Sequence, residues 1–365
     1  MIRVFRDFVE DRRISMDVYA DGLMEGLKIH GLTHFDVREF VPVAWLGFRG
    51  RKSTLGVRLS RYVEYPWQAF RARADIHHIV DHGYAHLLQV LDPTRTVVTV
   101  HDIIPILAWK GLIPGLTYPH RPRLIERSLG FLKEARFVVA DSENTKRTIM
   151  EHCGCRPDQV RVIYCGLRAE FHTVEAREKN ALRKQFGLPC GHTQLVLIVG
   201  QAPYKNLGGS LRVLARLVSA SSRPVKAVRV GQESAEWRTQ LDRSGIESAV
   251  VDLGPWPNSM IDLYQAVDCV LFPSWYEGFG WPPLEAMACG TPVVTSNVAS
   301  LPEVVGDAGL MRDPNDIEGL VTDVLAILND ARLRADMIER GRRRASAFTW
   351  GRYARQVLSL YEQIV

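Results

Sequence analysis

The chain has 365 residues, 46% of them hydrophobic and 24% charged, and its formal net charge is +5. These proportions are those of a globular protein and exclude disordered, collagen-like and coiled-coil chains. At about 100 to 200 residues per domain, the length predicts two domains that each bury a core. Because the sequence has no apolar run of about 18 residues and no apolar signal-peptide core, we expect a cytoplasmic protein, soluble or bound peripherally to the inner face of the membrane.

A basic segment comes first along the chain. Between Phe48 and Ala74 there are seven Lys or Arg residues and one acid, Glu64, with Trp67 and Phe70 interleaved. We interpret the segment as a solvated helix face or, alternatively, as a surface for an anionic membrane. We do not expect a nucleic-acid partner.

The rest of the first half predicts buried strands that end in polar or glycine turns. These strands are expected within residues 75–83, 94–102, 135–142 and 160–166. In open parallel sheets, ligands gather at the carboxyl ends of the strands. The side chains expected at those ends are His82, His101, Asp102, Asp141 and Ser142.

The second half has a clearer alternation of short apolar runs with helical patterns. Strands are expected within residues 194–200, 225–231, 249–254, 269–274 and 292–296, the last one closing the series. This alternation predicts a doubly wound parallel sheet, and therefore two similar α/β domains facing each other across a cleft. Residues 171–191 are predicted to link the domains, and Thr349 is predicted to begin a terminal helix.

The stretch "WYEGFGWPPLEAMACGTPVV", residues 275–294, carries the strongest chemical signal. Gly278 and Gly280 allow main-chain N–H groups to approach a ligand, and a helix predicted at 282–289 would present its N-terminus to phosphate. Glu277 before the loop and Glu285 in the first helical turn could accept hydrogen bonds from sugar hydroxyls. Taken singly, each feature also fits a tight turn or a helix dipole.

Residues 273–310, "PSWYEGFGWPPLEAMACGTPVVTSNVASLPEVVGDAGL", resemble the donor-site signature of glycosyltransferase family 4. Further segments resemble the family in the same order, among them "TVVTVHDIIPIL", "LIVGQAPYKNL" and "FTWGRYARQVLSLYEQIV". The resemblance implies the GT-B fold, in which two Rossmann-like domains face each other and a C-terminal helix returns to the N-terminal domain. We expect an acceptor-binding domain at 1–172, a donor-binding domain at 173–348 and the returning helix at 349–365.

The resemblance also implies a nucleotide-sugar donor and roles for residues of the second domain. Glu285 would bind the ribose hydroxyls, and Glu277 would lie against the donor sugar. Lys205, which follows the strand that ends in Gly200, would neutralise the leaving diphosphate. The backbone amides that would contact the sugar and the diphosphate are those of Gly278, Phe279 and Gly280.

Other positions match the family less completely. Pro255 and Trp256 lie where the base would pack, although a Trp beside a proline is also a common core pair. His101 corresponds to a family histidine near the donor sugar and phosphate. Gln201 and Tyr204 stand where many relatives carry an Arg, and only Gly22 is available for the glycine-rich loop that relatives often have near the amino terminus.

The resemblance implies a retaining hexosyltransferase that needs no metal or other cofactor, with Glu277, His101 and Lys205 as catalytic residues. We expect mannose transfer from GDP-mannose to a glycan or lipid-linked acceptor in cell-surface polysaccharide or glycolipid synthesis. The alternatives are a UDP-, ADP- or dTDP-sugar donor, a sugar-nucleotide epimerase of the same fold, and a non-catalytic carbohydrate-binding protein. A dinucleotide oxidoreductase is disfavoured because no Gly-x-Gly-x-x-Gly follows a strand.

Overall fold

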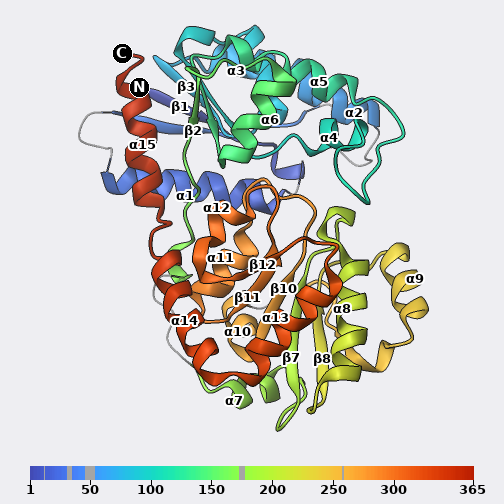
Figure 1. The fold of residues 1–365 in the computed structure, drawn as a ribbon. Coiled ribbons are helices and arrows are strands. Elements are labelled where there is room, and N and C mark those ends of the chain that lie inside the picture. The colour runs from blue at the N-terminus through green and yellow to red at the C-terminus, as the bar shows by residue number, and fades with distance from the viewer. Residues whose placement is uncertain (12, 31–34, 46–53, 172–176, 257–258) are drawn as a thin grey trace. The chain divides into compact units, whose positions relative to one another are not determined.

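The computed structural model describes residues 1–11, 13–30, 35–45, 54–171, 177–256 and 259–365. The chain forms two compact units, each described here by itself (Figure 1). The first consists of Met1–Leu112, Tyr118–Arg168 and Phe348–Val365, and the second of Ile113–Thr117 and Ala169–Ala347. Sequence reasoning did not anticipate that a five-residue segment from the first half belongs with the second unit.

The first unit contains a parallel sheet with the strand order β2-β1-β3-β4-β5-β6. Its strands are β1 (Ile2–Phe5), β2 (Val37–Phe40), β3 (Ile76–Ile79), β4 (Thr96–Val100), β5 (Phe137–Ala140) and β6 (Val160–Val162). The last four lie within the predicted stretches. The first two were not predicted. β2 is a partly exposed edge strand whose polar sequence VREF gives no apolar run.

Helices connect these strands and flank the sheet. They are α1 (Ile14–His30), α2 (Thr54–Leu59), α3 (Tyr65–Arg71), α4 (Ile104–Trp109), α5 (Arg123–Leu129), α6 (Glu143–Cys153) and α15 (Trp350–Glu362). As predicted, α15 begins after Thr349, whose side chain accepts a hydrogen bond from the N–H of Arg352 at 3.1 Å. This cap satisfies one of the unpaired donors at the helix start.

The terminal helix α15 packs against α1 in the first unit, which confirms the predicted return (Figure 1). A Cβ on Gly22 would lie 2.0 Å from Cε2 of Trp350, and a Cβ on Gly26 would lie 2.4 Å from the carbonyl oxygen of Trp350. Gly22 is therefore a helical residue whose missing side chain admits the indole. It does not lie in a glycine-rich loop.

The second unit contains a parallel sheet with the order β12-β11-β10-β7-β8-β9. Its strands are β7 (Gln194–Val199), β8 (Val225–Val230), β9 (Val250–Asp252), β10 (Cys269–Phe272), β11 (Val293–Ser296) and β12 (Leu310–Arg312). The first five confirm the predicted series. The prediction that residues 292–296 close the series was wrong, since the three-residue strand β12 pairs with β11 beyond it.

The helices of the second unit alternate with these strands. They are α7 (Lys179–Gln185), α8 (Leu207–Ala220), α9 (Ala235–Ser244), α10 (Met260–Ala266), α11 (Trp281–Ala288), α12 (Leu301–Val305), α13 (Ile317–Asn329) and α14 (Ala331–Ala345). The two parallel α/β sheets have the architecture that the sequence predicted.

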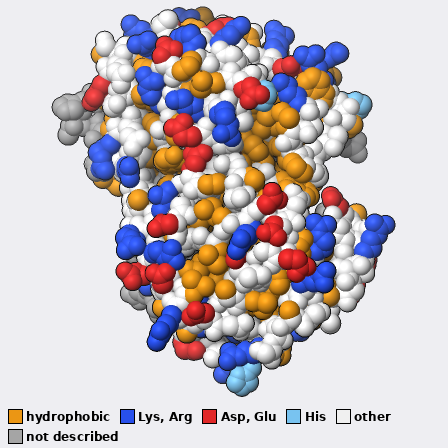
Figure 2. All heavy atoms as spheres, viewed as in Figure 1, with side chains coloured by type: hydrophobic (Ala, Val, Ile, Leu, Met, Phe, Trp, Pro, Cys, Tyr) orange, Lys and Arg blue, Asp and Glu red, His pale blue; other side chains and the backbone are white. Residues whose placement is uncertain are grey.

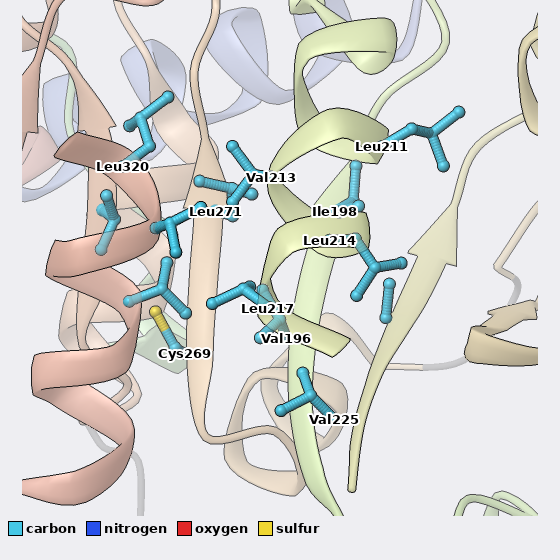
Figure 3. Packing of buried hydrophobic residues seen from close by; sticks show 14 of the residues in the cluster. Val196, Ile198, Leu211, Val213, Leu214, Leu217, Val225, Cys269, Leu271 and Leu320 are labelled. Carbon is cyan, nitrogen blue, oxygen red and sulfur yellow. The ribbon is translucent and has the colours of Figure 1, made fainter. Parts of the chain in front are cut away.

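A close-packed apolar core holds one face of this second sheet. Val196 and Ile198, two positions apart on β7, point to the same side of the sheet and meet Leu214 of α8 (Figure 3). Leu271 of β10 and Leu320 of α13 extend the same core. Truncating such a buried leucine to alanine typically costs about 2 to 5 kcal/mol. The strand ends that carry the candidate site therefore rest on a rigid layer.

The surface carries charges of both signs. On the face drawn in Figure 2, Lys and Arg side chains are interspersed with Asp and Glu on both units. Among the described helices, none combines the length and the apolar character needed to cross a membrane.

Candidate functional site

Lys205 is positioned by a glycine at the carboxyl end of β7. Gly200 has φ +121°, and its N–H donates to the carbonyl oxygen of Val230 at 2.9 Å. A Cβ at this position would lie 2.9 Å from Cγ of Lys205, so the lysine stem packs directly over the glycine backbone. Asn206 then begins α8, where its side chain accepts a hydrogen bond from the N–H of Gly209 at 3.1 Å. The glycine and the cap together hold Lys205 at the edge of the sheet.

The ammonium of Lys205 forms an ion pair with Glu277. Nζ lies 2.8 Å from Oε1 of Glu277, and the two side chains are only 14% and 9% exposed. The same nitrogen lies 4.5 Å from the ring centroid of Phe272 and 5.5 Å from that of Tyr204. Rings at these distances attract a cation. The structure therefore brings two of the predicted catalytic residues into direct contact.

The loop after Glu277 is held by Ser300. The Ser300 hydroxyl lies within hydrogen-bonding distance of two carbonyl oxygens, that of Glu277 at 3.0 Å and that of Phe279 at 2.7 Å. Gly280 ends the loop with φ +109°, and a Cβ there would lie 2.9 Å from Cδ2 of Leu301. A larger residue at position 280 would therefore be strained and would clash. The Ser300 contacts and the conformation of Gly280 therefore fix the backbone of this loop, so the loop is pre-shaped for a ligand.

Helix α11 follows this loop directly, with its prolines in the first turn as predicted. The helix begins at Trp281, one residue earlier than expected, and no acidic residue lies in its first turn. The placement of Glu285 in the first turn was therefore wrong, and the helix dipole does not account for this acid. Its Oε2 instead accepts a hydrogen bond at 2.9 Å from the hydroxyl of Tyr264, a fully buried residue of α10. Glu285 thus has an oriented carboxylate.

Trp275, two residues before Glu277, is covered by the segment Ile113–Thr117. Gly115 has φ +69°, and a Cβ there would lie 2.0 Å from Cζ3 of the Trp275 ring. The backbone N–H of Trp275 donates to the carbonyl oxygen of Tyr204 at 2.8 Å, and this bond connects the turn to the one that carries Lys205. A cavity of about 230 Å³ adjoins this contact, and its lining includes Gly115, Trp275, Gln201, Arg212, Glu236 and Gln240.

The residues predicted to contact the base lie after β9. Pro255 is exposed. The ring of Trp256 packs edge-on against Phe186 at a centroid distance of 5.0 Å, and its indole N–H donates to the carbonyl oxygen of Ser259 at 3.3 Å. Neither contact involves Lys205 or Glu277, and the contact with a base stays a prediction.

His101 belongs to the first unit, at the carboxyl end of β4. Its Nδ1–H donates to Oδ2 of Asp141 at 2.6 Å, and its Nε2–H donates to the carbonyl oxygen of Val80 at 2.9 Å. Burial alone would lower the pKa of His101, but the Asp141 carboxylate outweighs it and raises the pKa to about 9. The ring is therefore an imidazolium at neutral pH. Of the two roles considered for Asp102, the structure shows the turn residue, because its Oδ1 accepts from the N–H of Ile104 at 2.9 Å.

Sequence reasoning missed the residues that orient this chemistry. They are Phe272, Tyr264, Ser300 and Trp275 in the second unit and the pairing of Asp141 with His101 in the first. Trp275 and Phe272 border the motif and could have been noticed for their position. In contrast, Tyr264 is an ordinary residue of α10 and Ser300 lies in the turn before α12, and the role of each depends on contacts across the fold. In the described part of the chain, no group of His, Cys, Asp and Glu side chains is arranged to hold a metal ion.

Comparison with known proteins identifies the family of this chain. The family model described as "Glycosyltransferase Family 4" matches residues 9–171, and the model described as "Glycosyl transferases group 1" matches residues 178–344. O-antigen chain mannosyltransferase B of Escherichia coli is 30% identical over 275 residues, which cover 73% of this chain and 70% of that protein. The chain belongs to glycosyltransferase family 4.

Solved structures support the fold of this glycosyltransferase. Sucrose-phosphate synthase from Thermosynechococcus elongatus superposes with a TM-score of 0.76 at 20% identity, over 100% of this chain and 99% of that one. HepE from Anabaena, solved in complex with UDP and glucose, gives 0.72 at 20% identity over 99% of both chains. The predicted GT-B class of α/β fold is therefore confirmed.

In this glycosyltransferase, Gln201 and Tyr204 make local structural contacts. Gln201 accepts a hydrogen bond from the N–H of Gln232 at 2.8 Å through Oε1. Tyr204 presents its ring to Lys205. Of the described residues in this turn, Lys205 is the one that places a positive charge beside Glu277.

Proposed function

We propose that this glycosyltransferase moves mannose from GDP-mannose, with retention of anomeric configuration, to a hydroxyl of a glycan or lipid-linked acceptor. The observation that carries the proposal is the buried Lys205–Glu277 pair beside the pre-shaped loop that leads into α11. A nucleotide sugar has both a diphosphate for the lysine and the helix terminus and hydroxyls for the acids.

The proposed reaction breaks the bond between the sugar C1 and the diphosphate oxygen and forms a bond from C1 to the acceptor oxygen. The acceptor attacks on the same face of the sugar, and its proton passes to the departing phosphate. Lys205 and the amides of Gly278, Phe279 and Gly280 stabilise the negative charge on that phosphate. A fixed donor aimed at developing charge contributes about 3 to 4 kcal/mol.

The other residues of the proposed site bind the remaining parts of the donor. Glu285, oriented by Tyr264, binds the ribose hydroxyls, and Glu277 accepts hydrogen bonds from the donor sugar. Gly200 leaves room for the lysine stem, and Pro255 and Trp256 border the base. The His101 imidazolium contributes positive charge on the side of the first unit. Because both of its ring N–H groups already have protein partners, its effect on the donor phosphate is electrostatic.

The mannosyl donor is supported by the E. coli mannosyltransferase, and the same relative supports a role in cell-surface polysaccharide synthesis. A UDP-sugar is the second candidate, because HepE, which shares the fold, was solved with UDP and glucose. We further propose that the enzyme needs no metal ion, since the lysine and the helix terminus supply the positive charge. It would act in the cytoplasm, peripherally at the membrane.

The decisive experiment incubates the purified enzyme with GDP-mannose, UDP-glucose, ADP-glucose and dTDP-glucose, each with and without EDTA, and measures the nucleoside diphosphate released. We expect release of GDP from GDP-mannose, unchanged by EDTA. Release of UDP instead would replace the donor, and loss of activity with EDTA would overturn the metal-free mechanism. Proton NMR of the product's anomeric signal tests retention. No release from any donor, with or without acceptor glycans, would favour a carbohydrate-binding protein.

A further inference from the structure

The basic segment of the first unit presents an exposed apolar face. Eight of the sixteen exposed large hydrophobic side chains in the described residues lie between positions 41 and 70. They are Val41, Val43, Trp45, Leu55, Leu59, Val63, Trp67 and Phe70. A solvated helix face, the first interpretation of this segment, would be polar at these positions. A patch of this density indicates an interaction site.

The helix that carries most of this patch aligns its apolar residues on one side. It runs through α2, a π-helical turn at Ser60–Glu64, and α3. Leu55, Leu59, Val63 and Trp67 are each four positions apart, a step that drifts by about 40° per repeat on an ideal α-helix. The π turn holds more residues per turn and so offsets that drift. The stripe therefore stays on the outer face along the length of the helix.

The neighbouring loop adds to the same surface. The Gln68 side chain accepts a hydrogen bond from the N–H of Val43 at 3.0 Å and donates one to its carbonyl oxygen at 2.6 Å. Glu64 accepts from the N–H of Trp45 at 3.2 Å, and the Trp45 ring meets the Trp67 ring edge-on at 5.4 Å. These bonds hold the loop against the helix.

The charges on this surface are all positive. Within residues 54–74 the single acid, Glu64, is buried. Arg58, Arg71 and Arg73 are exposed, whereas Arg61 turns inward to Asp11 at 2.7 Å. The guanidinium of Arg71 lies 4.7 Å from the Trp67 ring centroid, and that of Arg73 lies 4.1 Å from the Phe70 centroid. Of the seven basic residues in the segment, Arg49, Arg51 and Lys52 lie outside the described residues.

We propose that this apolar-basic face, residues 41–45 and 55–73, docks onto a bilayer that contains anionic lipid. Exposed tryptophans beside arginines are suited to the headgroup boundary, where the ring is buried and the guanidinium binds phosphate. An apolar stripe flanked by cations and free of exposed acids is complementary to an anionic lipid surface. This inference rests on the proposed function, because docking would bring the enzyme to a lipid-linked acceptor in the membrane.

Vesicle flotation without any sugar nucleotide tests this proposal. The probes are vesicles of phosphatidylcholine alone and vesicles in which about a third of the lipid is phosphatidylglycerol, at low and high salt. We expect binding to the anionic vesicles that weakens with salt. Trp67→Ser/Phe70→Ser should reduce it at least about tenfold, and Arg71→Gln/Arg73→Gln should reduce mainly its salt-sensitive part. Val218→Ser, which removes an equally exposed apolar side chain from α8, is the matched control and should bind normally.

A second readout locates the contact. Brominated lipid should quench the tryptophan fluorescence of the wild type, and Trp45→Phe/Trp67→Phe should lose most of that quenching. Binding that is equal for both vesicle types, or unchanged in the Trp67/Phe70 variant, would overturn the proposal. So would concentration-dependent dimerisation in light scattering that the Trp67/Phe70 variant abolishes, because the face would then bind a second copy. Donor turnover with a soluble acceptor is measured in parallel, so a failed docking proposal leaves the proposed function intact, and the reverse also holds.

Discussion

Nζ of Lys205 lies 2.8 Å from Oε1 of Glu277, although the two residues are 72 positions apart in the chain. Each side chain is almost wholly removed from solvent, so neither charge can be lost without leaving the other unpaired. In the proposed site, a donor diphosphate would share the ammonium with a carboxylate already in place. The lysine is therefore held in position before the donor binds.

Replacing either partner should abolish most of the activity. Lys205→Met and Glu277→Gln are each expected to lower turnover at least about a hundredfold, because each removes a fixed contact to the reacting groups. The double variant should lose little more than the worse single variant, since the two side chains act as a unit. Steady-state kinetics, with the donor that the nucleotide-release experiment selects, measures all three.

The second unit provides a matched control for this prediction. Nζ of Lys179 lies 2.8 Å from Oδ1 of Asp268, which precedes β10 at the opposite end of the strand from Glu277. Lys179→Met removes an ion pair of the same length and should leave turnover unchanged. Near-normal turnover of folded Lys205→Met and Glu277→Gln proteins would contradict the proposed site.

Tyr264→Phe should affect donor binding more than chemistry. The substitution keeps the buried ring and removes the hydrogen bond to Glu285, so the carboxylate loses its orientation. A lost hydrogen bond of about 1 kcal/mol corresponds to a KM for the donor that is about fivefold higher, with kcat little changed. Tyr361→Phe, which removes a buried hydroxyl that bonds His78 in the first unit, is the control. A fall in kcat at unchanged KM would contradict the ribose role of Glu285.

The features that sequence reasoning predicted are those that local chemistry dictates. Gly280 adopts a positive φ, prolines occupy the first turn of α11, and Thr349 caps α15. In each case the residue type alone indicates the local conformation. The orienting contacts were not predicted, because Tyr264 and Glu285 meet only through the packing of α10 on α11. The strand β12 was missed because none of its three residues, LMR, is buried and they form no apolar run of the kind that marked the other strands of this sheet.

The same limit applies to His101. A histidine at the end of a strand could be predicted to have a partner, and the adjacent Asp102 was the natural candidate. The structure pairs His101 with Asp141, which lies at the end of the neighbouring strand β5. Which acid faces the ring depends on the strand order, and the order cannot be read from the strands themselves.

Asp141→Asn should lower the pKa of His101. In the wild type the ring is expected to titrate near pH 9, because the carboxylate outweighs the effect of burial. Without that negative charge, burial dominates and the pKa should fall below the ordinary value of about 6.5. NMR of the His101 ring proton measures both. His78, whose pKa burial lowers to about 3, is the internal control and should not titrate above pH 5 in either protein.

The stability of the first unit should follow the same titration. Because the folded pKa of His101 is raised above the unfolded one, its contribution is fully present below about pH 6.5 and is lost as the pH rises through 9. The contribution amounts to about 2 to 4 kcal/mol. Thermal unfolding of the wild type minus that of His101→Gln, from pH 6 to 10, isolates it. A difference that grows with pH would show the opposite sign and contradict the assignment.

Gly115→Ala tests whether the segment Ile113–Thr117 positions the turn from Trp275 to Glu277. The added methyl group would lie 2.0 Å from the Trp275 ring, so the indole or the segment must move. The backbone N–H of Trp275 donates to the carbonyl oxygen of Tyr204, which precedes Lys205, and Trp275 itself lies two residues before Glu277. A shift of Trp275 would therefore disturb both partners of the Lys205–Glu277 ion pair. We expect kcat/KM to fall about tenfold, the scale of a small displacement of a positioned group.

Gly111→Ala separates that effect from backbone strain. Gly111 has φ +70°, nearly the same as Gly115, but a Cβ there would meet no atom within 4 Å. Gly111→Ala should therefore lose about 1 kcal/mol of stability from the left-handed backbone, as measured by chemical denaturation, and Gly115→Ala should lose at least as much, because it adds the clash with Trp275 to the same strain. Only Gly115→Ala should lose activity, and only it should change the fluorescence of Trp275. Equal kinetic losses in the two variants would mean that strain, and not the contact with Trp275, is responsible.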